Sequence, residues 1–176
     1  MSIAQTLLAE FEAQAPLTRK FLERLPEDKL AWKPHEKSMT AGQLAMHIAR
    51  VPGGVIRAVE QDSMPVPEFR SPSAQPQPTN IQEILEVYDD SVRTVRATLP
   101  QLSESRMQQN FRFMQGDKEV WAMPRVQFLR DIMLNHWYQH RGQLSVYLRL
   151  LNIAVPATWG PSADEAPAFL EQAKSA

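Results

Sequence analysis

The sequence predicts an all-α protein, a four-helix bundle in which a long crossover joins the second and third helices. Four segments repeat apolar residues at intervals of three or four positions, which is the spacing of a helix that buries one face. Most of the 14 prolines lie between these segments rather than inside them. A chain of 176 residues is long enough for one domain with its own core. We therefore expect residues 1–176 to form a single domain.

The first two helices are each predicted to contain a proline. The first runs over about residues 3–25, and Pro16 should kink or split it because proline lacks a backbone donor and clashes one turn back. The second opens at Thr40, where a glutamine three residues later completes a capping-box pattern. We expect this helix to continue, kinked at Pro52, to about Gln61.

The second half of the chain contains the long connection and the last two helices. Residues 64–80 hold five prolines and few large apolar groups, so we expect a connection without an element of its own. Residues 81–99 form the clearest amphipathic helix. Residues 101–123 are compatible with a short hairpin or with an ordered loop. The fourth helix is predicted from Pro124 to about Leu151.

The composition excludes several kinds of function. The net charge of −1 leaves no basic excess for nucleic acid or for an anionic membrane surface. The chain has no cysteine, so disulfides, thiolate metal ligands and cysteine nucleophiles are excluded. No segment resembles a signal peptide or has the apolar length of a membrane span, and we expect a cytoplasmic protein.

Three of the four histidines fall on helix faces that should point into the core. His136 and His140 stand four residues apart in the fourth helix, so both imidazoles lie on the same face. His47 lies on the apolar stripe of the second helix, between Leu44 and Val51. Three neutral imidazoles can bind zinc, nickel, copper or iron and leave an open coordination position. The pattern indicates a metal site, and the ordinary alternative for each residue is a hydrogen-bonded core histidine.

The residues around these histidines exclude some classes of metal site. The string from His136 to His140 lacks the glutamate of the HExxH zinc proteases, and no carboxylate stands beside any of the three histidines. A di-iron carboxylate bundle is therefore excluded, and no general base is visible. Asn135, Gln139, Gln143 and Gln43 are candidates for orienting a ligating ring, although solvated surface positions are the simpler interpretation of the first two.

Four short motifs carry a resemblance to a known family. The most specific is HWYQHRGQL, which starts at His136, and the others are LAWKP from Leu30, LAMHI from Leu44 and WGPSAD from Trp159. With these motifs, the chain resembles the DinB/YfiT-like superfamily of metal-binding four-helix bundles over nearly its whole length.

The resemblance implies an up-down-down-up bundle, frequently homodimeric, in which His47, His136 and His140 hold one zinc or nickel ion. Relatives with known activity include thiol-dependent S-transferases and a mycothiol-dependent isomerase, where the metal activates the thiol of a low-molecular-weight cofactor. We therefore expect a metal-dependent thiol transferase of the detoxification type, acting on a small molecule. The alternatives are a metal-dependent hydrolase and a non-catalytic, dimeric, stress-related binding protein with a structural metal.

Overall fold

Helices make up most of the structure, a computed structural model that describes residues 2–68, 75–167 and 169–170. Its long helices are α1 (Ile3–Glu23), α2 (Ala41–Glu60), α3 (Ile81–Thr98) and a composite fourth helix. The composite helix consists of α5 (Arg125–Phe128), a π-helical segment (Leu129–His136) and α6 (Trp137–Leu150). Two 3-10 turns (Glu27–Lys29 and Leu99–Gln101) and the short helix α4 (Glu104–Gln108) lie in the connections.

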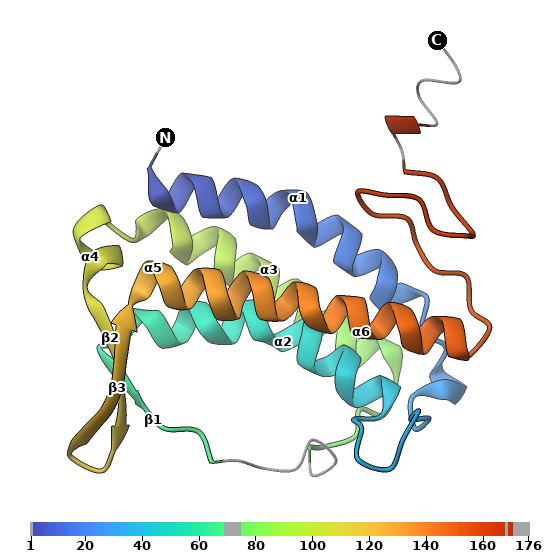
Figure 1. Ribbon diagram of the computed structural model, residues 1–176, viewed down its shortest axis with the longest axis horizontal. Coiled ribbons are helices and arrows are strands. Elements are labelled where there is room, and N and C mark those ends of the chain that lie inside the picture. The colour runs from blue at the N-terminus through green and yellow to red at the C-terminus, as the bar shows by residue number, and fades with distance from the viewer. Residues whose placement is uncertain (1, 69–74, 168, 171–176) are drawn as a thin grey trace.

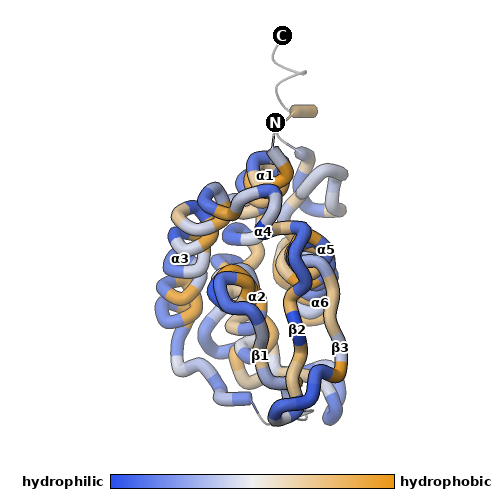
Figure 2. The backbone as a smooth tube through the Cα atoms, turned by 90° about the vertical axis from the view of Figure 1, so that its left-hand side faces the viewer, coloured by the Kyte–Doolittle hydropathy of each residue, from blue (hydrophilic) through white to orange (hydrophobic). Residues whose placement is uncertain are grey.

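The long helices are arranged in the predicted order. α1 and α6 run in one direction and α2 and α3 in the other, which is an up-down-down-up bundle (Figure 1). Figure 2, turned by 90°, shows the helices placed around a common centre, with the strands nearest the viewer. That centre is filled by fully buried side chains, among them Phe11, Ile48, Ile56 and Trp137.

The internal prolines do not split their helices. α1 continues through Pro16, and α2 continues through Pro52. After Pro52 the backbone N–H of Gly53 donates to Oγ of Ser91 in α3 at 2.6 Å. A Cβ atom on Gly53 would lie 2.9 Å from Cα of Ser91, so only glycine allows α3 to approach α2 this closely.

The structure corrects the prediction of a purely helical bundle. A three-stranded sheet lies at one end of the bundle, in the order β1 (Ser63–Pro65), β2 (Asn110–Gln115) and β3 (Lys118–Pro124) (Figure 1). Of the two alternatives for residues 101–123, the hairpin is therefore the correct one. The expectation that residues 64–80 contain no element is wrong at their start, because β1 pairs in parallel with β2. Residues 69–74 of this connection lie outside the described part of the chain.

The hairpin forms because its sequence alternates in polarity and contains a suitable turn. Phe111 and Phe113 are buried, and the residues on either side of Phe111 are exposed. Gly116 opens the two-residue turn with φ of 58°, a conformation that glycine adopts without steric cost. The phenyl ring of Phe111 stacks on Phe128 with centroids 5.0 Å apart, which fixes the hairpin to the composite helix.

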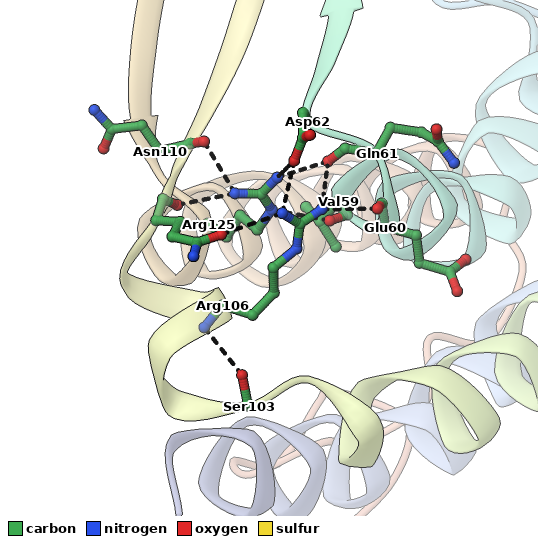
Figure 3. A network of polar contacts seen from close by, with 9 residues as sticks. Val59, Glu60, Gln61, Asp62, Ser103, Arg106, Asn110 and Arg125 are labelled. Carbon is green, nitrogen blue, oxygen red and sulfur yellow. Dashed lines mark hydrogen bonds and ion pairs between the residues drawn. The ribbon is translucent and has the colours of Figure 1, made fainter.

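A buried arginine joins the sheet to the end of α2 (Figure 3). The side chain of Arg125 is fully buried and donates to the carbonyls of Val59, Gln61 and Asn110 at 2.7–2.9 Å. It also forms an ion pair with Asp62 at 3.0 Å. Carbonyls at the end of a helix have no partner within the helix, so Arg125 satisfies acceptors that would otherwise be orphaned.

No helix in the described ranges is long and apolar enough to cross a membrane.

Candidate metal centre

The structure brings together the three histidines that the sequence singled out. Nε2 of His136 lies 3.0 Å from Nε2 of His47 and 3.1 Å from Nε2 of His140. The three rings are nearly perpendicular to one another, with centroids 4.3–5.3 Å apart. One ligand atom from each residue lies within 4.8 Å of the other two. α2, the π-helical segment and α6 each contribute one of these side chains.

Burial keeps the three imidazoles in the form that binds metal. Together with the neighbouring histidines and Arg50, it lowers the pKa of His47 to about 4, and burial is the largest of these causes. Burial also lowers the pKa of His136 and of His140. The rings are therefore neutral at pH 7, and a neutral imidazole nitrogen can donate its lone pair to a cation without first releasing a proton.

Gln143 fixes the tautomer of His140. Its Oε1 lies 2.7 Å from Nδ1 of His140, and a carbonyl oxygen can only accept, so Nδ1 carries the proton. The neutral ring then presents Nε2 to the cluster as a bare lone pair. Partners of this kind orient metal-ligating histidines and raise their basicity. Gln143 is one of the four residues that the sequence predicts as candidates for orienting a ligating ring.

The other three candidates do not take this role in the contacts of the structure. Asn135 and Gln139 are exposed, in agreement with the simpler interpretation of them. Gln43 completes the capping box of α2 by accepting from the backbone N–H of Thr40, and its amide donates to the carbonyl of Gln75.

The three Nε2 atoms cannot satisfy one another by hydrogen bonds alone. His136 can offer at most one proton at Nε2, while two nitrogens face it. At least one nitrogen pair therefore meets without a hydrogen between its atoms. A cation among the three lone pairs would satisfy all of them, and nitrogens 3.0–3.1 Å apart can both lie at about 2.0–2.1 Å, the usual zinc–nitrogen distance, from one ion.

A hydrogen bond beside the cluster holds α2 and α6 together. Pro52 has no N–H to offer the carbonyl of Ile48 one turn earlier in α2. The indole Nε1 of the fully buried Trp137 donates to that carbonyl at 3.0 Å. Ile48 directly follows His47 in the chain, and Trp137 directly follows His136. Pro52 therefore leaves free the carbonyl that accepts from the indole of Trp137, and this bond links the residue after His136 to the residue after His47.

A largely apolar pocket opens beside the cluster, with a volume of about 510 Å³. His47 is part of its lining, so the histidine cluster and the pocket share a wall. Phe113 and Trp121 of the hairpin form another wall, and Phe128 and Ile132 of the composite helix complete it. Volumes of this order are typical of small-molecule sites.

Two parts of the site were not visible in the sequence. The π-helical segment Leu129–His136 ends at a metal-ligand candidate, and π-helical turns are frequent at functional sites. Apolar spacing does not distinguish its wider turn from an α-helix. The sequence did not predict the pocket because it forms between α2 and the hairpin, which lie far apart in the chain, and the only sequence signal for it was the aromatic residues Phe113 and Trp121.

Known proteins resemble this chain in sequence and in fold. Residues 10–144 match the DinB superfamily. The uncharacterized protein YrdA of Bacillus subtilis (strain 168) is 28% identical over 158 residues, which cover 89% of this chain and 86% of YrdA.

Two solved structures share the fold. The DinB-like protein of Bacillus cereus ATCC 10987 has a TM-score of 0.68 and 21% identity, over 88% of this chain and 97% of that one. The DinB-like protein YjoA of Bacillus subtilis has a TM-score of 0.66 and 19% identity, over 87% and 96% of the two chains. With the family match extending over most of its length, the chain belongs to the DinB superfamily.

Proposed function

We propose that this protein binds one divalent metal ion, zinc or nickel, through His47, His136 and His140, and transfers a low-molecular-weight thiol to an electrophilic small molecule. The observation that carries the proposal is the convergence of three neutral imidazoles at the edge of an apolar pocket. An ion held by three neutral histidines keeps its full charge and an open position, and it lowers the pKa of a thiol or water that coordinates it.

Each part of the site would have its own role in the reaction. The histidines hold the ion, Gln143 keeps the proton of His140 on Nδ1, and the apolar pocket excludes water and receives the electrophile. In the transfer, the thiol proton goes to solvent and a sulfur–carbon bond forms. The bond from that carbon to its leaving group breaks, and the leaving group departs with the electron pair.

The donor set favours thiol transfer over hydrolysis. No carboxylate of the described ranges joins the histidine cluster, so no general base for a water nucleophile is in place there. A thiol has an ordinary pKa of about 8.5 and needs less help than water to lose its proton at pH 7. An apolar electrophile bound in the pocket would lie beside His47, which is part of the pocket wall.

Cobalt substitution with thiol titration tests the proposal. We expect L-cysteine and 2-mercaptoethanol to produce sulfur-to-cobalt charge-transfer absorption, and 1-chloro-2,4-dinitrobenzene to be consumed with release of chloride. His140→Ala should lose both signals, whereas His35→Ala should keep them, because His35 is exposed in the loop before α2.

Two other outcomes would contradict the proposal. If thiols leave the cobalt spectrum unchanged and the metal-loaded protein hydrolyses p-nitrophenyl acetate instead, the enzyme is a hydrolase. If neither reaction occurs and His140→Ala only lowers the melting temperature, the metal is structural and the protein is a binding module.

A further inference from the structure

The pocket beside the histidines is elongated along α2. Its lining residues on this helix run from His47 to Ala58, which corresponds to about 16 Å at 1.5 Å per residue. Val51 and Val55 lie between these ends and present aliphatic side chains to the pocket. A ligand that fills it would have an apolar body lying along the helix, with one end close to the metal centre.

The hairpin supplies an aromatic wall that the bundle alone would lack. Trp121 stacks on Phe113 with ring centroids 4.9 Å apart and an interplanar angle of 27°. Phe113 is buried, but Trp121 keeps 53% of its surface exposed. A large aromatic side chain at an open apolar pocket is characteristic of a ligand-binding site.

The charges at the pocket favour an anionic ligand. Two arginines line it, and they differ in their partners. Arg57 forms an ion pair with Asp90 at 2.5 Å and donates to Thr94 at 2.9 Å. Arg50 is exposed and has no ion pair within the described ranges. It lies one helical turn after His47, so the uncompensated positive charge is at the histidine end of the pocket.

We propose that this pocket binds an apolar organic acid, with its carboxylate paired to Arg50 and its aromatic or aliphatic body between α2 and the hairpin. The inference rests on the proposed function, since it identifies the class of the electrophile. The acid would be one whose reactive carbon lies near its carboxylate, because Arg50 would then hold that carbon beside the histidine centre. Guanidinium–carboxylate pairs are strong and can be bidentate, which would fix the orientation of the ligand.

Three naphthalene probes of the same shape test the role of charge. The probes are 2-naphthylacetate, 2-(2-naphthyl)ethanol and 2-(2-naphthyl)ethylamine. Each is titrated into metal-free protein, and binding is followed by calorimetry and by tryptophan fluorescence. We expect the acid to bind at least about tenfold more tightly than the alcohol, which corresponds to about 1.4 kcal/mol, and the amine to bind most weakly. Arg50→Gln should lower the affinity of the acid to that of the alcohol and leave the alcohol unchanged.

Position 54 offers a matched pair of variants that tests the pocket itself. Gly54 is part of the lining, and a Cβ atom placed on it meets nothing within 4 Å. Gly54→Leu should therefore block the pocket without a clash and weaken all three probes at least about tenfold. Gly54→Ala should change the affinities by less than about threefold. Both variants should fold at least as well as the wild type, because glycine is a poor residue for a helix interior.

Three results would overturn the inference. The first is equal binding of the acid and the alcohol. The second is loss of the preference for the acid in Arg57→Gln but not in Arg50→Gln. The third is a dimer in sedimentation experiments that Gly54→Leu dissociates while no probe binds, since the pocket would then be an interface between copies. Because metal-free protein is used, a failed thiol-transfer assay leaves these results intact, and the two proposals fail separately.

Discussion

The indole N–H of Trp137 donates to the carbonyl of Ile48 at 3.0 Å, and this bond links the residue after His136 to the residue after His47. The carbonyl is free because the next turn of α2 carries Pro52, which has no N–H to give. Sequence-based reasoning treats an internal proline as a defect of a helix. In this protein the proline leaves free the acceptor of a hydrogen bond that lies directly beside two metal-ligand candidates.

Trp137→Phe should therefore destabilise the fold and weaken metal binding together. The variant leaves the buried Ile48 carbonyl without a donor, which costs about 1–3 kcal/mol. Urea denaturation of the metal-free protein measures the loss, and competition with a chelator measures the affinity. Trp159→Phe is the control, because Trp159 is 61% exposed. An unchanged chelator competition for Trp137→Phe would show that the bond does not position the histidines.

Gln143→Leu should weaken metal binding without unfolding the protein. The side chain holds the proton of His140 on Nδ1, and loss of such a partner typically lowers metal affinity about 10- to 100-fold. Zinc affinity measured with a fluorescent competitor checks this, with Gln139→Leu as the control, because Gln139 is exposed on the same helix. Equal zinc affinities in the two variants would contradict the role given to Gln143.

The stability of the metal-free protein should fall as the pH is lowered from about 6.5 towards 4. The folded-state pKa of His47 is about 4, below its ordinary value of 6.5, and those of His136 and His140 are also lowered. In this range the unfolded chain takes up more protons than the folded one, so acid favours unfolding. Above pH 6.5 the histidines are neutral in both the folded and the unfolded chain, so their full contribution to the free energy of unfolding is present.

Urea unfolding at a series of pH values measures this dependence. His47→Gln should flatten the curve between pH 4 and 6.5, since the residue with the most strongly lowered pKa is then absent. A metal-free wild type whose stability is constant across this range would show that the histidines are not buried as neutral rings.

Arg125→Met should destabilise the protein by at least about 1–3 kcal/mol, the usual cost of one buried acceptor left without its donor, because the variant leaves more than one such acceptor. The carbonyls of Val59, Gln61 and Asn110 would lose their donor, and the sheet would lose its main polar link to α2. Thermal and urea unfolding check the value. Arg112→Met is the matched control, because Arg112 is exposed on β2. Similar losses in both variants would contradict the role of Arg125.

The helices and the histidine cluster could be predicted from the sequence because both depend on local spacing. Helical periodicity places His136 and His140 on one face, and the apolar stripe of α2 that includes Leu44 and Val51 turns His47 inwards. The sheet could not be predicted in full, because β1 exists only through its pairing with β2, a strand that lies 45 or more residues later in the chain. A buried arginine such as Arg125 also has no local signature, since its partners are backbone carbonyls brought together by the fold.

The most direct test of the central claim is the metal content of untagged protein by mass spectrometry, with wild type, His140→Ala and His35→Ala purified in parallel. We predict one equivalent of zinc or nickel in the wild type and in His35→Ala, and its loss in His140→Ala. An absence of metal from all three proteins, even after incubation with both ions, would contradict the account and leave His47, His136 and His140 as histidines of the core.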